Sequence, residues 1–175
     1  MSWLEFETIP FAEALLRGAE VHPDRDCIVV SNDRVTCGAL EARARVVRRS
    51  FIALGIQRGD RVGILMANSL DYTDILFGAS LIGAIPVLYN ARFKAQVFLG
   101  DGHRDDFMDR DTFYSHADAV DPIAVDGRHA GTRVTDTALM FYTSGTTAMP
   151  KGCPLDHIVL QHAGVVGGAD RLRLN

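Results

Sequence analysis

Apolar residues recur along the chain at the two spacings that separate helices from strands. Leu40, Ala44, Val47, Phe51 and Leu54 lie three or four positions apart, which predicts a helix from about Gly38 to Leu54. Such a helix is expected to be capped by Thr36 and stopped by Gly55.

A strand, a helix and a second strand are predicted next. Val62–Met66 is uniformly apolar, as in a strand that is buried on both faces, and Ile85–Leu88 has the same character. Between them, Asn68 or Ser69 can cap a helix, whose apolar positions are Tyr72, Ile75, Leu76, Ala79 and Ile82. This order, with short polar turns, predicts a right-handed βαβ crossover and therefore an α/β fold with a largely parallel sheet and flanking helices.

The two ends of the chain carry shorter signals. A short helix is expected after Pro10, and Cys27–Val30 and Arg34–Thr36 predict a hairpin across the turn at 31–33. Thr137–Tyr142 is apolar enough for a strand. Ile158–Ala169 is a candidate helix, with three glycines that weaken its second half: Gly164, Gly167 and Gly168.

An aspartate-rich segment at about 94–136 interrupts this periodicity and predicts irregular structure. Its aspartates are Asp101, Asp105, Asp106, Asp109, Asp111, Asp118, Asp121 and Asp126. His103, His116 and His129 lie among them, without the short fixed spacing that places two metal ligands on one face. A solvated loop is favoured over a metal site, and no metal ligand can be assigned.

Composition and charge exclude several classes. About half of the residues are apolar and the formal net charge is −4, which argues against disorder and against nucleic acid as the main partner. Neither a signal peptide nor an apolar stretch of the roughly 20 residues that span a bilayer is seen. The three cysteines, Cys27, Cys37 and Cys153, are odd in number and widely spaced, which favours a reducing, cytoplasmic setting.

Two local features have alternative interpretations. The cluster of Arg43, Arg45, Arg48 and Arg49 on one predicted helix is usually a solvated face, and a role in binding anions or a membrane surface is the alternative. For Cys153, a small apolar residue near the next motif is favoured over a nucleophile, because no partner base is evident.

The most specific chemistry lies between Phe141 and Gly152, in the stretch Phe-Tyr-Thr-Ser-Gly-Thr-Thr-Ala-Met-Pro-Lys-Gly. It offers hydroxyl donors, a glycine that lets the backbone approach an anion, and a lysine. A Walker A loop is excluded, because the spacing from glycine to the Gly-Lys-Ser/Thr element is absent. Expected phosphate-binding residues are Thr143, Ser144, Gly145, Thr146, Thr147 and Lys151.

This stretch resembles the phosphate-binding signature of the adenylate-forming (AMP-binding) superfamily, Tyr-Thr-Ser-Gly-Thr-Thr-Gly-x-Pro-Lys-Gly, and departs from it at Ala148. The segments Ala53–Ser69, Gly83–Arg92 and Lys151–His157 also look like family segments in the expected order, the last leading into a helix near a histidine. Asp156 stands where Ser or Thr is usual and can still cap that helix. Among the family's members, the chain looks most like the N-terminal part of an acyl-CoA synthetase, a fatty-acid–CoA ligase.

The resemblance implies ATP, Mg²⁺ and coenzyme A as cofactors and a carboxylic acid, taken as a fatty acid, as substrate. The acid attacks the α-phosphorus of ATP, pyrophosphate leaves, and the acyl-adenylate is captured by a thiol. Preorganised donors and magnesium stabilise the leaving pyrophosphate, with Lys151 at the β and γ oxygens. If position 148 needs a positive φ, Ala148 costs on the order of 1 kcal/mol.

Residues 1–175 are expected to form the N-terminal portion of an AMP-binding domain, because the family's later elements are absent from this sequence. No catalytic residue is assigned, and the chain alone is expected to be inactive. The alternatives are a non-catalytic nucleotide-binding remnant and a structural α/β fragment. An open sheet edge would allow a homo-oligomer. The acid that is activated cannot be read from the sequence.

Overall fold

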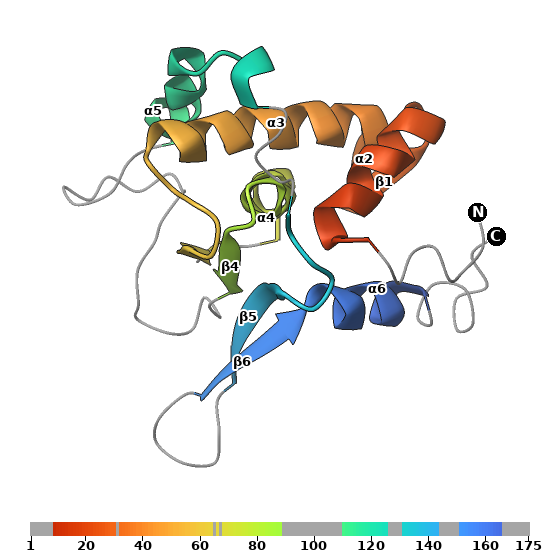
Figure 1. The fold of residues 1–175 in the computed structure, drawn as a ribbon. Helices are drawn as coiled ribbons and strands as arrows, with labels where there is room; N and C mark the ends of the chain where they lie inside the picture. The colour runs from red at the N-terminus through yellow and green to blue at the C-terminus, as the bar shows by residue number, and fades with distance from the viewer. Residues whose placement is uncertain are drawn as a thin grey trace.

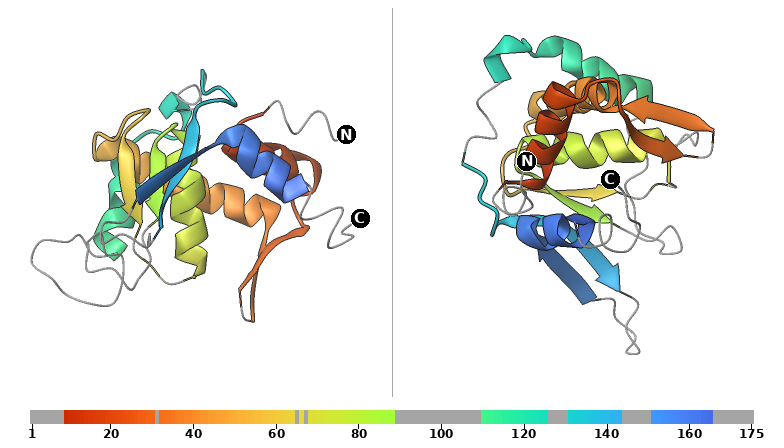
Figure 2. Two further views of the ribbon diagram at one scale, coloured as in Figure 1. Left: turned by 90° about the horizontal axis from the view of Figure 1, so that it is seen from below. Right: turned by 90° about the vertical axis from the view of Figure 1, so that its right-hand side faces the viewer.

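The computed structural model describes residues 9–30, 32–64, 66, 68–88, 110–125, 131–143 and 151–165. Helices lie over one face of a sheet, and a small hairpin stands apart (Figures 1 and 2). In chain order the elements are α2 (Phe11–Val21), β1 (Asp26–Val30), β2 (Asp33–Thr36), α3 (Cys37–Ala53), β3 (Arg61–Ile64), α4 (Leu70–Leu81), β4 (Ile85–Leu88), α5 (Arg110–Ser115), the 3-10 turns η1 (His116–Ala119) and η2 (Ile123–Val125), β5 (Thr137–Thr143), β6 (Lys151–Asp156) and α6 (His157–Val165).

The ends of α3 and α4 follow the predicted capping residues. The Thr36 hydroxyl accepts a hydrogen bond from the Ala39 N–H at 3.3 Å, and the Ser69 hydroxyl accepts one from the Tyr72 N–H at 3.2 Å. Gly55, just after α3, has a φ of 82°, a conformation that glycine adopts without a steric penalty. Local sequence chemistry therefore sets where these two helices begin and where α3 ends.

The main sheet confirms the predicted α/β class. Among the described residues its strand order is β3-β4-β5-β6, with β3, β4 and β5 parallel and β6 antiparallel to β5. The predicted burial of the first strand on both faces is wrong. Of the predicted range, Val62, Gly63 and Met66 are partly exposed and Ile64 is buried, and in this order β3 lies at the edge of the sheet.

Strand β6 was not predicted from the sequence. Lys151–Asp156 pairs along its length with β5, whereas the pattern had indicated a direct continuation into a helix. Gly152 and Pro154 are residue types that are rare in strands, so the sequence did not indicate one here. Pro154 is tolerated because β6 is an edge strand. The predicted helix does follow at His157, and the Asp156 carboxylate caps it by accepting a hydrogen bond from the Val159 N–H at 2.8 Å.

Helices α3 and α4 form the centre of the molecule. Helix α4 lies between α3 and the sheet in Figure 1. One buried cluster joins both helices to the sheet through residues such as Val47, Ile75 and Leu139, and a second joins them to α2 and the hairpin β1–β2. The two helices approach closely at Gly78, where an added Cβ would lie 2.4 Å from Val47 Cγ1.

Part of the aspartate-rich segment is more ordered than predicted. Residues 110–125 form α5, η1 and η2, and Phe113 is 4% exposed with its ring 5.2 Å from the ring of Phe51. Helix α5 is also held by Arg110, which donates two hydrogen bonds to Asp71 at 2.9 and 3.0 Å. The prediction of a solvated loop is therefore wrong for this part. His116 lies in η1, while His103 and His129 lie outside the described residues.

Candidate functional site

The two ends of the predicted phosphate loop are brought together by the strands that flank it. Thr143 is the last residue of β5, Lys151 is the first residue of β6, and the two form the terminal pair of the antiparallel ladder. Opposite residues in such a ladder have Cα atoms about 4.5–5.5 Å apart. Ser144, Gly145, Thr146, Thr147 and Ala148 lie outside the described residues.

The loop lies at a favourable place in the sheet. Strands β4 and β5 are parallel, with Leu88 opposite Phe141, so their carboxyl ends point to the same edge. In open α/β sheets, ligands bind in the crevice beyond the carboxyl ends of the strands. The fold thus supports the predicted location, while the contacts of the individual loop residues stay a prediction.

The surroundings of this loop differ from those of a Walker A loop. There a helix follows the loop directly, and the N-terminus of that helix contributes N–H donors and a partial positive charge. Here β6 follows the loop, and α6 begins only at His157, after the whole of β6. The helix that follows the loop in a Walker A site is therefore replaced here by a strand, and Lys151 at its start is exposed.

Gly152 has a packing reason within this hairpin. It lies opposite Tyr142, and a Cβ at this position would come within 3.2 Å of the Met140 sulfur and 3.6 Å of the Tyr142 ring. The absence of a side chain lets these two groups approach the β6 backbone beside Lys151. Cys153 lies in β6 opposite Phe141 and is partly exposed.

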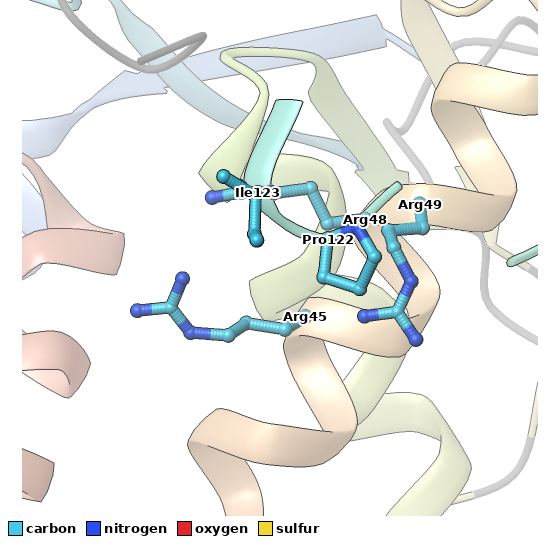
Figure 3. Close-up of a pocket in the computed structure, with 5 residues that line it drawn as sticks. All are labelled: Arg45, Arg48, Arg49, Pro122 and Ile123. Atoms are coloured by element: carbon cyan, nitrogen blue, oxygen red, sulfur yellow. The ribbon is translucent and has the colours of Figure 1, made fainter. Parts of the chain in front are cut away.

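The arginine cluster on α3 is not the uniformly solvated face that was predicted. Arg45, Arg48 and Arg49 line a cavity of about 280 Å³ together with Pro122 and Ile123, and Arg48 is only 2% exposed (Figure 3). Arg45 and Arg49 extend away from each other around this cavity.

Arg43, the remaining member of the cluster, is bound to a buried carboxylate. It donates three hydrogen bonds to Asp74, at 2.5, 2.9 and 3.0 Å. Asp74 is 1% exposed, and its burial raises the pKa of its carboxyl group although Arg43 opposes the shift. Sequence reasoning missed this pair, because the two residues lie on different helices and 31 positions apart.

Cys27 and Cys37 lie closer together than their sequence spacing suggested. Burial, and next the hydrogen bond to the Cys37 thiol, raise the pKa of Cys27 to about 12. The Cys27 thiol therefore stays protonated at neutral pH. All three cysteines are free thiols.

The described part of the chain contains no helix with the length and apolar character needed to cross a membrane. It also contains no group of three histidine, cysteine or acidic residues placed to hold a metal ion.

Comparison with known proteins agrees with the resemblance seen in the sequence. Residues 15–98 match the family model "AMP-binding enzyme". A 4-chlorobenzoate–CoA ligase of Arthrobacter is 29% identical over 154 residues, which cover 75% of this chain and 30% of the relative. A 2-succinylbenzoate–CoA ligase of Bacillus cereus is 28% identical over 162 residues, which cover 86% of this chain and 33% of the relative.

Solved structures show the same fold. An anthranilate CoA ligase, AuaEII, in complex with anthranoyl-AMP superimposes with a TM-score of 0.78 at 19% identity and covers 97% of this chain and 39% of its own. The N-terminal domain of FACL13 from Mycobacterium tuberculosis gives a TM-score of 0.66 at 25% identity, over 85% of this chain and 44% of its own.

The comparisons show that the chain is similar to AMP-binding enzymes in residues 15–98 and that it shares the fold of an anthranilate CoA ligase. More narrowly, its curated relatives include CoA ligases, and its fold matches the N-terminal domain of FACL13. The chain spans about a third of the length of the curated relatives it matches. The matched family region ends before the phosphate loop, so the loop motif is a separate observation in favour of the same class.

Proposed function

We propose that these residues form the polyphosphate-binding part of an ATP-dependent, AMP-forming ligase that joins a carboxylic acid to coenzyme A. The observation that carries the proposal is the loop motif between β5 and β6, with Thr143 and Lys151 paired at the carboxyl edge of a largely parallel sheet. The relatedness to AMP-binding enzymes and CoA ligases supports the same reaction class.

The assigned task of this part is electrostatic. Thr143, Ser144, Gly145, Thr146 and Thr147 are proposed to donate hydrogen bonds to the β- and γ-phosphates, and Lys151 to add a positive charge that moves with the leaving pyrophosphate. ATP supplies the adenylyl group that activates the acid. Magnesium and coenzyme A enter the proposal through the family alone, and no described residue is assigned to either.

The range of candidate acid substrates is wider than the sequence resemblance suggested. A fatty acid remains one candidate, and the names of the relatives add aromatic acids, since they include chlorobenzoate, succinylbenzoate and anthranilate ligases. The cytoplasm is proposed as the location, supported by the odd number of cysteines. The proposal includes self-association through an open strand edge such as β3.

The test is a calorimetric titration of magnesium ATP into the full 175-residue chain and its Lys151→Ala variant. A hydrogen bond to a charged group contributes about 1.5–3 kcal/mol, so the variant is expected to bind at least about tenfold more weakly. Arg34→Ala is the matched control, because it also removes one exposed positive charge but lies in the separate hairpin β1–β2.

The outcomes separate the candidate functions. Binding that weakens in Lys151→Ala and not in Arg34→Ala supports a nucleotide site at the loop. Release of AMP and an acyl-CoA product from an added acid would then distinguish a ligase from a non-catalytic nucleotide-binding remnant. If neither the parent chain nor the variants bind ATP, the proposal fails and a structural α/β fragment is favoured.

A further inference from the structure

A second polar cavity lies at the end of the sheet opposite to the phosphate loop. It has a volume of about 470 Å³ and is formed where the chain enters β3, β4 and β5, at the amino ends of these parallel strands. The start of α6 also contributes to it. Its lining residues are Arg58, Gly59, Gly83, Ile85, Thr132, Thr135, Asp136, Thr137 and His157.

The turns that build this cavity are tied together tightly. The Gly59 N–H donates a hydrogen bond to the Gly83 carbonyl at 2.9 Å, and both glycines have positive φ, 85° and 71°. A Cβ at Gly83 would lie 2.9 Å from Arg58 Cγ and 3.2 Å from the Thr132 hydroxyl. The glycine therefore keeps open the space into which these two side chains extend.

Among the described residues, Asp136 is the carboxylate that lines the cavity, and it is already engaged by donors. Asp136 accepts hydrogen bonds from Arg58 Nη2 at 2.5 Å and from the backbone N–H of Arg133 at 2.9 Å, and a further contact from Arg133 Nε at 3.4 Å. The backbone hydrogen bond, and next the two arginines, hold the pKa of Asp136 below its usual value. Arg58 lines the cavity and Arg133 does not, so the described lining contains one guanidinium and one carboxylate. Asp60 and Asp156 do not line the cavity, and each accepts a backbone hydrogen bond, although the charge of Asp156 acts on His157.

His157 presents a donor rather than a charge. It is 2% exposed, and its Nδ1 accepts a hydrogen bond from the Phe11 N–H at 2.9 Å. A ring that accepts at Nδ1 is neutral and carries its proton on Nε2. Burial lowers the pKa of His157, which keeps this neutral form at physiological pH. Within the described residues, no recorded hydrogen bond uses Nε2.

Thr132 adds a buried hydroxyl that has no hydrogen-bond partner within the described structure. A buried polar atom of this kind costs free energy unless a ligand or water satisfies it. The described lining therefore offers an imidazole N–H, threonine hydroxyls and the guanidinium of Arg58 as donors, while the carboxylate of Asp136 already accepts from Arg58 and Arg133.

We propose that this cavity binds a small oxyanion, with phosphate as the representative ligand, through Arg58, Thr132 and His157. The anion accepts hydrogen bonds from the guanidinium, the hydroxyl and the imidazole Nε2–H, and no bond in it is made or broken. This site is independent of the proposed ATP site, because it lies beyond the amino ends of the strands and the phosphate loop lies beyond the carboxyl end of β5.

The test uses the full ¹⁵N-labelled chain carrying Lys151→Ala, so that the phosphate loop contributes as little as possible. Inorganic phosphate is titrated at constant ionic strength against chloride, and NMR follows the backbone amides of Thr132 and Asp136 and the ring nitrogens of His157. Saturable shifts of these signals are expected, with the His157 ring remaining neutral.

Three variants in the same background locate the ligand. Arg58→Gln is expected to weaken phosphate binding about tenfold, because a charged hydrogen bond is lost. Thr132→Val is expected to weaken it about threefold while leaving the folded chain at least as stable, since the hydroxyl has no partner to lose. Arg34→Gln is the control, because Arg34 also pairs with one aspartate at 2.5 Å but lies in the hairpin β1–β2.

The results decide as follows. Saturable binding that is weakened by Thr132→Val and unaffected by Arg34→Gln supports the site, even if Arg58→Gln fails to fold. No saturable shift, as for a cavity filled by water alone, overturns the proposal. Saturable shifts that both site variants leave unchanged overturn it equally. None of these outcomes bears on ATP binding, which is measured in the chain with an intact Lys151. The oxyanion proposal and the ATP proposal can therefore fail independently of each other.

Discussion

The ion pair between Arg43 and Asp74 allows a sharp prediction, because one partner is buried and the other reaches solvent. The change is Arg43→Met, which keeps the length and much of the apolar stem of the side chain. It removes three hydrogen bonds to a carboxylate that is 1% exposed, and among the described residues it leaves the Tyr114 hydroxyl, at 3.5 Å, as a weak donor.

The magnitude follows from the unequal exposure of the partners. Removing one partner of a fully buried ion pair costs about 3–5 kcal/mol, because the other charge is left without compensation. The Arg43 side chain is 39% exposed, so solvent already screens part of the interaction. We therefore expect the free energy of unfolding to fall by about 2–3 kcal/mol at pH 7.

The loss should depend on pH with a defined sign. In the parent chain burial raises the pKa of Asp74 while Arg43 lowers it, so the variant is expected to have a still higher folded-state pKa. The folded variant then binds a proton that the unfolded chain releases. The stability of the variant relative to the parent is therefore greatest below the pKa of an unfolded aspartate, about 3.9. It falls as the pH rises through the folded-state pKa of Asp74 in the variant.

Urea unfolding of the parent and the variant at pH 7 and pH 5 measures both effects. Arg34→Met is the matched control, because Arg34 and Asp26 form an exposed pair, and it should cost less than about 1 kcal/mol at either pH. A loss in Arg43→Met no larger than in the control, or a loss that is the same at both pH values, would refute the reasoning.

Three further predictions concern packing and protonation. Gly78→Ala should lower the free energy of unfolding in urea by about 1–2 kcal/mol, because overpacking against Val47 is partly offset by the higher helix propensity of alanine. Adding Val47→Ala to the same chain should restore part of this loss. If the losses of the two single variants simply add in the double variant, the prediction is wrong. Gly83→Ala should lower the stability of the chain more than Gly55→Ala does. A Cβ at position 55 meets no atom within 4 Å, so that variant has only backbone strain of about 1 kcal/mol. Equal unfolding midpoints of the two variants would disprove the argument from contacts. His157 has a lowered pKa, so the unfolded chain takes up its proton first and stability should fall as pH drops below about 6.5; His157→Asn should reduce this slope between pH 7 and 5, and an unchanged slope would count against it.

Most helices and strands could be predicted because their signals are local. The apolar spacing along α3, the serine before α4 and the apolar run of β4 each depend on a few neighbouring residues. The class of the candidate site was equally accessible, since hydroxyls, glycines and a lysine in one short stretch are a local composition. The position of Thr143 at the carboxyl end of a strand could be expected from the parallel order of the strands, whereas the pairing of Lys151 with it could not, because β6 was not predicted.

What could not be predicted depends on contacts between distant segments. The exposure of β3 follows from the strand order, and the sequence of β3 carries no sign of it. Helix α5 gains its order by burying Phe113 against α3 and by the bonds of Arg110 to Asp71 on α4. The cavity that His157 lines is formed by three turns and the start of a helix, which are distant from one another in the sequence. The spacing of residues along the chain does not predict that these segments lie together.

The antiparallel pairing of β5 with β6 limits how the phosphate loop can change in length during evolution. Seven residues, 144–150, separate two positions that face each other across a ladder. Successive side chains of a strand point to opposite faces, so a shift of β6 by one residue would turn Lys151 to the other side of the sheet. Insertions and deletions that shift the register of β6 should therefore be tolerated when they change the length by an even number of residues. This can be checked by comparing the lengths of the loop among related sequences.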